Sequence, residues 1–195
     1  TVIDLDLSSD AGREAQVRNG DRIEINPVLD QLENVVLTEG HLQRPGGYRW
    51  REGIRVSDVI PSVSALLPNP DLQYALVVRQ EAQTRISTVL KLELGNAIAN
   101  PGGAEDLVLQ SNDRVVTFGS TVSREENLSE LLDELNAQAS FDNPAAIVTV
   151  AGNIRFPGEY PYLEGMSVGD MVNSAGGMLE SSDQRYALLI RNRDN

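Results

Sequence analysis

Hydrophobic positions along the chain follow the period of β-strands more often than that of helices. Apolar-rich runs predict strands over residues 35–42, 46–50, 74–79, 86–94 and 114–118. In the fourth run, one face of a half-buried strand is expected to carry Ile86, Thr88, Leu90, Leu92 and Leu94. Pro45-Gly46 lies between the first two runs and supplies a turn, which predicts a hairpin.

The same pattern recurs later in the chain without gaps. Residues 35–79 align with residues 147–191 at a constant offset of 112, and 16 of the 45 aligned positions are identical. We call these two stretches the first and second head. Because each repeat of such a duplication is one structural unit, both heads are expected to have the same backbone path.

A shorter segment is duplicated as well, and we call it the tail. Residues 1–7 resemble 88–94, and residues 19–25 resemble 111–117. The chain therefore reads tail, head, tail, head. The predicted boundaries follow that order: 1–31 is the tail of a preceding module, 32–120 a module, 121–141 a linker with a helix, and 142–195 a module truncated at its carboxy terminus. A further hypothesis is that residues 1–27 complete the second module, in the same chain or a neighbouring one.

Each head is predicted to contain a short helix after its hairpin. In the second head, Ser167 and Asp170 form an N-terminal capping pair, and Ala175-Gly176-Gly177 is typical of a helix end. The first head has Arg55 at the capping position, and Pro61 is expected to end or bend its helix. A small mixed sheet crossed by one helix predicts the α+β class for each module.

A longer helix is predicted between the modules, over residues 123–137. Ser123 and Glu126 have the spacing of a capping box. The apolar stripe of this helix consists of Leu128, Leu131, Leu132 and Leu135. Two interpretations stay open: the stripe packs on the chain's own modules, or it forms a seam with a neighbouring subunit.

The composition narrows the possible partners. The chain has 29 acidic and 16 basic residues, a formal net charge of −13, and no cysteine. A surface with this excess of negative charge repels the phosphate groups of nucleic acids and of anionic lipids. No nucleic-acid partner is therefore expected. The chain begins at Thr1 without a signal peptide and has no stretch long enough to span a membrane. It is therefore expected to be part of a longer protein, with membrane contact only through segments outside it.

No catalytic, cofactor or metal site is predicted. The single histidine, His41, aligns with Asn153 in the second head and has no nucleophile motif around it. Aspartates such as Asp21 and Asp113 lie at expected turns. Paired carboxylates suited to glycoside hydrolysis stay open as an alternative, because their separation is a structural quantity.

Four aromatic residues flank the predicted hairpins: Tyr48, Trp50, Tyr160 and Tyr162. Sugars stack on aromatic faces, so these side chains are candidate contacts for a glycan or a partner. The alternative is that they cover the small core, since aromatic side chains bury large apolar areas.

The second head carries a set of motifs that resembles a known family. Its first part is a strand with the sequence Gly152-Asn153-Ile154, followed by the turn Pro157-Gly158-Glu159-Tyr160. Next come the helix start at Ser167–Asp170 and the helix end at Ala175-Gly176-Gly177. The last part is a strand that ends in an arginine, Ala187–Arg191. This pattern is similar to the soluble-ligand-binding β-grasp (SLBB) repeats of bacterial outer-membrane polysaccharide export proteins. The first head departs from it at Ser64-Ala65, which replace the two glycines, and at Pro61.

The resemblance implies tandem β-grasp modules in a periplasmic, outer-membrane-associated protein of capsule or exopolysaccharide export. It implies a polysaccharide substrate and a homo-oligomer that surrounds the polymer path, with no enzymatic activity and no cofactor. Two alternatives stay open: a soluble module that binds a glycan or partner without forming a channel, and an acid-based glycan-processing enzyme.

Overall fold

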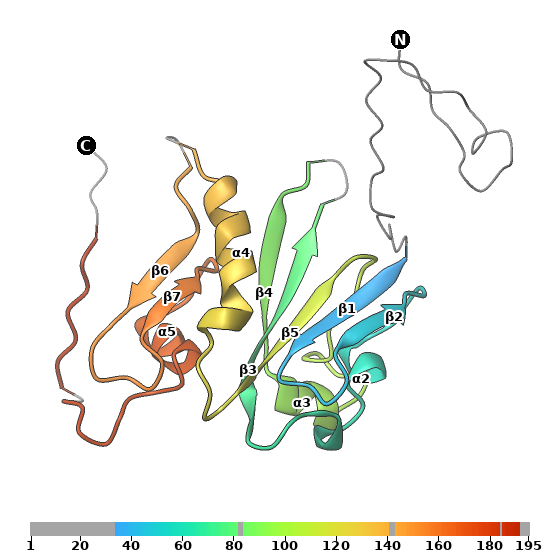
Figure 1. Cartoon of the computed structure of the whole chain (residues 1–195), viewed down its shortest axis with the longest axis horizontal. Coiled ribbons are helices and arrows are strands. Elements are labelled where there is room, and N and C mark those ends of the chain that lie inside the picture. The colour runs from blue at the N-terminus through green and yellow to red at the C-terminus, as the bar shows by residue number, and fades with distance from the viewer. Residues whose placement is uncertain (1–33, 82–83, 141–142, 184, 192–195) are drawn as a thin grey trace, which may run out of the picture. The chain divides into compact units, whose positions relative to one another are not determined.

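The computed structural model describes residues 34–81, 84–140, 143–183 and 185–191. The predicted tail at residues 1–31, and its suggested role in completing the second module, lie outside the described residues. The described part contains a five-stranded sheet, a separate two-stranded sheet and several helices (Figure 1). This composition is the predicted α+β class.

The five-stranded sheet contains strands of the first head and of the following tail. Its strands are β1 (Val35–Gly40), β2 (Gly46–Arg49), β3 (Pro70–Gln80), β4 (Ser87–Leu92) and β5 (Arg114–Gly119). Their order is β2-β1-β5-β3-β4, with β1 and β5 parallel and the other neighbours antiparallel. The central strand is therefore β5, and β3 pairs with β5 on one side and with the edge strand β4 on the other.

Side chains of β3 alternate between two apolar clusters, because successive residues of a strand point to opposite faces. Ala75 and Val77 belong to the cluster that includes the helices α2 (Val56–Val59) and α3 (Leu94–Ala99). Leu76 and Val78 belong to the cluster formed with α4 and the second head. Both faces of this sheet are therefore buried.

The second head forms its own hairpin and helix. Its elements are β6 (Ile147–Val150), β7 (Gly158–Pro161) and α5 (Val168–Ser174). The β1–β2 hairpin pairs Val35 with Arg49 and Thr38 with Gly46. The β6–β7 hairpin pairs Ile147 with Pro161 and Val150 with Gly158. Adding 112 to each residue of the first hairpin gives the register of the second.

The correspondence continues past the hairpins. A bridge joins Leu42 to Leu66 in the first head, and a bridge joins Ile154 to Met178 in the second. In both heads the helix starts at equivalent positions, Val56 and Val168. The backbone agreement therefore extends through residues 35–66 and 147–178, as the duplication predicts.

The helix ends differ as the sequence indicates. In α5, the Ser167 hydroxyl accepts a hydrogen bond from Asp170 N at 3.1 Å, and Asp170 accepts one from Ser167 N at 3.0 Å. In α2, Arg55 N donates to the Asp58 carboxylate at 2.9 Å, and the arginine side chain, which has no acceptor atom, accepts no hydrogen bond in return from the first turn. α2 ends at Val59, two residues before Pro61. The structure thus confirms the stronger cap on α5 and the stop at Pro61.

The helix of the linker is α4 (Glu125–Ala137). Leu128, Leu131 and Leu135 are buried in the cluster shared by the sheet and the second head, and Leu132 packs against it. The stripe therefore packs on the chain's own modules. The predicted capping box does not form: Arg124 is the cap residue in helical conformation, and Ser123 Oγ instead accepts from Glu125 N at 3.3 Å.

Two strand predictions need correction. Both faces of β4 are buried: Leu90 and Leu92 pack at the first core, as predicted, and Ser87 and Val89 are buried on the opposite face. Ile86 and Thr88, predicted to share the face of Leu90 and Leu92, are exposed. The reason is that α4 packs on the face assumed to be open, and Ser87 Oγ bonds Glu134 there at 3.0 Å. Leu94 begins the unpredicted helix α3 rather than ending a strand.

The last strand of the second head is the other correction. Residues 186–191 match the buried centre of β3 in sequence, but they are extended, exposed and in no sheet. β3 is stabilised by pairing with β4 and β5. The described residues contain no equivalent neighbours for 186–191. Because the backbone N–H and C=O groups of a buried strand need hydrogen-bond partners, this segment does not form a strand among the described residues.

Candidate functional site

The junction between the first sheet and the second head centres on a buried arginine. Arg124 lies directly before α4, and its side chain is 1% exposed. Its guanidinium donates to the carboxylate of Asp71 on β3 and to the backbone carbonyl of Ser174 at the end of α5. One side chain therefore joins the sheet to the helix of the second head.

Aromatic rings surround the same guanidinium. Its central carbon lies 4.8 Å from the ring centre of Tyr74, 5.4 Å from that of Phe118 and 5.2 Å from that of Phe156. Tyr74 and Phe118 come from the sheet and Phe156 from the second head. Cation–π attraction is strongest where water is excluded, as at this junction. Burial raises the pKa of Tyr74, so its hydroxyl stays neutral beside the arginine.

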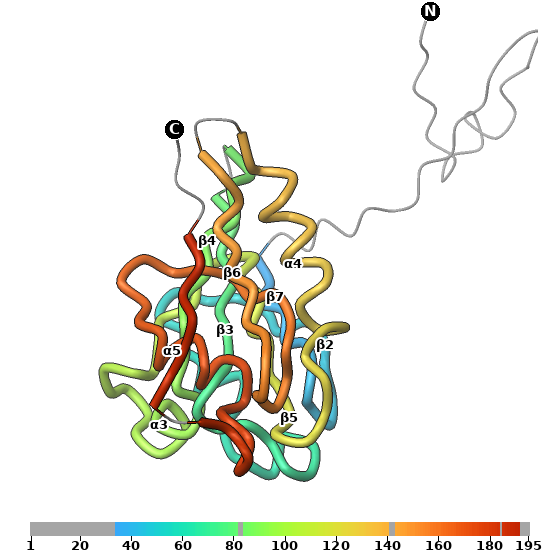
Figure 2. Tube along the Cα trace, turned by 90° about the vertical axis from the view of Figure 1, so that its left-hand side faces the viewer, coloured from blue at the N-terminus to red at the C-terminus, as the bar shows by residue number. Residues whose placement is uncertain are grey.

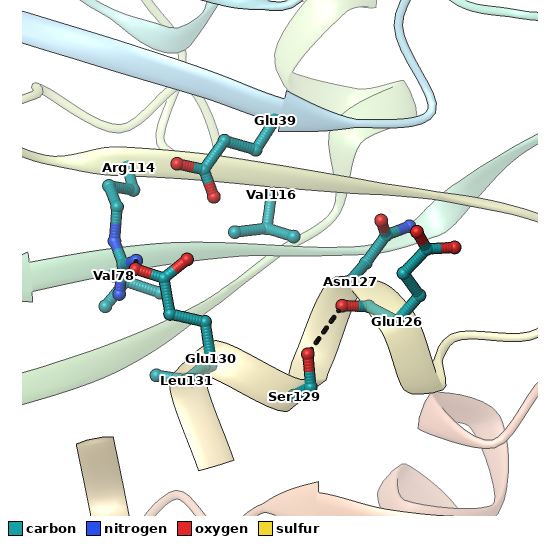
Figure 3. A pocket seen from close by; sticks show the side chains of 9 residues that line it. All are labelled: Glu39, Val78, Arg114, Val116, Glu126, Asn127, Ser129, Glu130 and Leu131. Carbon is teal, nitrogen blue, oxygen red and sulfur yellow. Dashed lines mark hydrogen bonds and ion pairs between the residues drawn. The ribbon is translucent and has the colours of Figure 1, made fainter. Parts of the chain in front are cut away.

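A second polar group lies in a hollow between β1, β5 and α4 (Figure 3). Arg114 on β5 pairs with Glu130 at 3.1 Å and with Glu134 at 2.7 Å. Figure 3 shows the Glu39 side chain extending from β1 on the side of the hollow that Arg114 and Glu130 line. Burial raises the pKa of Glu39, and the carboxylates of Glu130 and Glu134 raise it further, while Arg114 lowers it.

The chemistry of this hollow favours a structural role. Its volume is about 160 Å³, below the several hundred Å³ of typical small-molecule sites. Glu130 in its lining and Glu134, one turn further along α4, are held in ion pairs with Arg114, which ties α4 to β5.

The four aromatic candidates divide into two pairs. Tyr160 is 1% exposed, and its hydroxyl donates to the Phe156 carbonyl at 2.6 Å. Trp50 is half-buried against the first core, and its indole N–H donates to the Leu109 carbonyl at 2.9 Å. Tyr48 and Tyr162 are 37% and 44% exposed. The structure thus places two of the four in the packed interior and leaves two at the surface.

Equivalent positions in the two heads have different surroundings. Tyr48 and Tyr160 occupy the same place in their hairpins, directly opposite Val36 and Val148. Tyr160 is buried because α4 packs against β7. The duplicated sequence therefore does not by itself set the exposure of a side chain.

Two further candidates have local roles. The His41 ring lies 2.8 Å from the carbonyl of Pro68, which joins the segment after β1 to the segment before β3. Asp113 is fully buried and accepts two hydrogen bonds from Arg79, at 3.0 and 2.7 Å. Asp113 thus anchors the turn before β5 to β3, in addition to its predicted turn role.

The sequence reasoning did not single out Arg124, Arg114 or Glu39. An arginine before an amphipathic helix has no local signal for burial, since arginines are mostly exposed. Asp71 is identical to its repeat equivalent Asp183, but Asp183 accepts a hydrogen bond from the backbone of its near neighbour Arg185 at 2.9 Å. The repeat alone therefore does not predict the ion pair between Arg124 and Asp71.

Comparison with known proteins identifies one part of the chain. Residues 147–194 match the family model of the SLBB domain, so the second head is an SLBB domain, as its motifs indicated. The comparison with curated proteins finds no match. Among the helices of the described residues, none is both long and apolar enough to cross a membrane.

Proposed function

We propose that this chain is a non-catalytic part of a polysaccharide export protein, in which tandem SLBB modules assemble subunits around the path of the polymer. The SLBB match over residues 147–194 is the observation that carries this proposal. SLBB domains occur in such export proteins and bind soluble ligands. The setting we propose is the periplasm, at the outer membrane, with capsule or exopolysaccharide as the cargo.

The first head is proposed to be a second SLBB module. Its hairpin register, its bridge at Leu42–Leu66 and the start of its helix all correspond to the second head at an offset of 112. Sequence identity at 16 of 45 positions supports the same relation. Tandem modules with both faces of one sheet buried make a rigid spacer, which suits a ring wall better than a mobile binding arm.

The described polar groups support a role without chemistry on the substrate. Arg114 holds Glu130 and Glu134 in ion pairs, and Arg124 holds Asp71. General acid–base catalysis instead needs a carboxyl group free to exchange a proton with a bound substrate. These carboxylates are better suited to joining structural elements.

The proposed partners are the polysaccharide and further copies of the chain. The net charge of −13 disfavours nucleic acid, and membrane contact is assigned to segments outside these residues. Tyr48 and Tyr162 are the proposed glycan or partner contacts, because their rings are exposed. Their exposure also favours the second candidate function, a module that binds a soluble glycan without forming a channel.

The test is made in the cells that produce the protein. Deleting the gene should lower surface polysaccharide at least ten-fold while polymer retained inside the cells stays level or rises. Expression of the intact gene should restore export. Unchanged surface polymer overturns the export role. Binding of the purified chain to that polysaccharide, together with normal export in the deletion strain, favours the soluble glycan-binding candidate.

A further inference from the structure

We infer that the β1–β2 hairpin of one molecule docks in the groove between α4 and β7 of a second copy of this chain. The inference rests on the proposed assembly role and names the two surfaces that make the contact between subunits. The hairpin presents arginines, and the groove presents carboxylates beside apolar side chains.

The hairpin concentrates positive charge on an acidic chain. The formal net charge of the chain is −13, yet residues 40–50 contain two arginines, one histidine and no acidic residue. The next arginine, Arg51, pairs with Asp58 at 3.3 Å. Arg44 and Arg49 are exposed and form no ion pair within the described part of the chain. Their guanidinium groups are therefore available to carboxylates of another molecule.

The position of β2 leaves this hairpin accessible. β2 lies at the edge of the five-stranded sheet, where it pairs only with β1 among the described strands. All four of its residues, Gly46–Arg49, are exposed. A strand at a sheet edge presents its side chains and backbone groups to other chains. A neighbouring molecule can therefore reach the hairpin without displacing any described element of this one.

The groove lies between α4 and β7, which run side by side (Figures 1 and 2). Its volume is about 390 Å³, within the several hundred Å³ typical of binding sites. Three carboxylates line it: Glu125 and Asp133 from α4, and Glu159 from β7. All three are exposed, and none forms an ion pair with another residue that the structure describes. Arg124 also lines the groove, but its guanidinium is already bound to Asp71.

The apolar lining of the groove suits an arginine side chain. Leu128 and Leu132 from α4 and Phe156 from the second head line the same space as the carboxylates. The aliphatic part of an arginine packs on apolar side chains while its charged end stays near polar groups. Its planar guanidinium also stacks on aromatic rings and binds carboxylates at two points. The groove therefore offers each part of an arginine a matching surface.

The two heads share a hairpin but differ in its charge. Both hairpins have the same register at an offset of 112. At that offset Phe156 stands at the position of Arg44, and Glu159 stands at the position of Gly47. Phe156 and Glu159 both line the groove. The second head thus lacks a charge that would repel the first hairpin, and it carries an aromatic wall and a carboxylate instead.

The hairpin and the groove of one molecule do not fill each other. Neither Arg44 nor Arg49 is among the residues that line the groove. The groove of one molecule is therefore open to the hairpin of the next. Because the two surfaces are different, the contact is head-to-tail, and successive molecules form a ring or an open chain.

The test uses two variants of the chain, each of which loses one surface and keeps the other. Arg44→Gln/Arg49→Gln alters the hairpin and keeps the groove, while Asp133→Arg alters the groove and keeps the hairpin. In sedimentation, each variant alone should self-associate at least ten-fold more weakly than the wild type. An equimolar mixture should form 1:1 dimers with the affinity of the wild-type contact. It should form nothing larger, because only one hairpin and one groove in each pair are intact.

Matched controls move the same charge elsewhere on the surface. Arg85→Gln/Arg185→Gln removes two exposed positive charges, and Glu105→Arg reverses one exposed negative charge. Both should associate like the wild type, and circular dichroism checks that every variant is folded. Equal losses in the controls overturn the inference. So does a mixture of the hairpin and groove variants that stays monomeric, or a wild-type chain that is monomeric at every concentration measured.

An acidic polysaccharide is the alternative occupant of the hairpin arginines, and alginate, a polyuronate, is the probe for it. If Arg44→Gln/Arg49→Gln loses alginate binding but self-associates like the wild type, the hairpin is a glycan site and the inference is overturned.

The outcomes also separate this contact from the export role. If the variants behave as expected but export persists in the deletion strain, the export role is wrong while the subunit contact stands. If export is lost in the deletion strain but the hairpin and groove variants associate like the wild type, the contact is wrong while the export role stands.

Discussion

The guanidinium of Arg124 donates to the carboxylate of Asp71, although 53 residues separate them and the arginine is 1% exposed. Asp71 belongs to β3 in the first head, and Arg124 precedes α4 in the linker. The same guanidinium reaches the Ser174 carbonyl in the second head. The pair therefore sets how the second head lies on the sheet.

Replacing Arg124 by methionine should destabilise the described unit by about 3 kcal/mol, because the buried Asp71 carboxylate loses its partner. The matched control is Arg51→Met. The Arg51 side chain is 73% exposed and pairs with Asp58 at 3.3 Å, so about 0.5 kcal/mol or less is expected. Urea unfolding measures both changes. Similar costs for the two variants would show that Arg124 does not hold the junction.

The cap of α5 should make stability depend on acid. Hydrogen bonds from the Ser167 hydroxyl and backbone, together with Lys91, hold the pKa of Asp170 well below its usual range. A lowered pKa in the folded state adds stability above the unfolded value of about 3.9, and this is lost as pH falls through the folded value. Asp170→Asn should therefore lower the melting temperature at pH 7, and the difference from wild type should shrink between pH 4 and pH 2.

The control for Asp170 is Glu164→Gln, which removes an exposed carboxylate just before the same helix. Its difference from wild type should stay nearly constant over that pH range. A constant difference for Asp170→Asn as well would contradict the role of its carboxylate in the cap.

Glu39 should have the opposite pH dependence. Burial and the neighbouring Glu130 and Glu134 raise its pKa, so the folded state favours the protonated form. The stability from this preference is fully present below the unfolded pKa, near 4.3, and is lost as pH rises through the folded value. Glu39→Gln should therefore raise the melting temperature more at pH 7 than at pH 4.

The comparison for Glu39 is Glu52→Gln, a change at an exposed position in the loop after β2. Its effect should be small at both pH values. If Glu39→Gln lowers the melting temperature at pH 7, the carboxylate stabilises the hollow through Arg114 and the expected sign is wrong.

The two tyrosines of the second hairpin should respond differently to truncation. Tyr160→Ala should cost about 3 kcal/mol or more, because the ring is buried between β7 and α4. Tyr162→Ala should cost less than about 1 kcal/mol, because its side chain is 44% exposed. Chemical denaturation with a check of the secondary structure measures both. Equal losses would contradict the burial of Tyr160 by α4.

Much of the local structure could be predicted because its causes are local. The turn at Pro45-Gly46, the cap of Ser167 and Asp170, and the glycines after α5 depend on residues within a few positions of one another. The predicted capping box at Ser123 failed for a tertiary reason: the buried contacts of Arg124 place the helix start one residue later.

For the candidate aromatic residues, the sequence indicated their positions in the hairpins but not which of them would be exposed. Tyr48 and Tyr160 are equivalent in sequence and in hairpin register, yet only Tyr160 is covered by α4. Exposure depends on which element packs against a position, and that contact comes from distant parts of the chain.

The repeat, the hairpins and the short helices follow from the residue pattern, since turn chemistry and side-chain periodicity act over a few residues. Three features depend on contacts between distant segments: α4 and the second head cover one face of the first sheet, Arg124 is buried at their junction, and residues 186–191 are exposed. The physical reason is that a strand needs paired neighbours and a buried charge needs a partner. Whether the chain supplies either one depends on how distant segments meet.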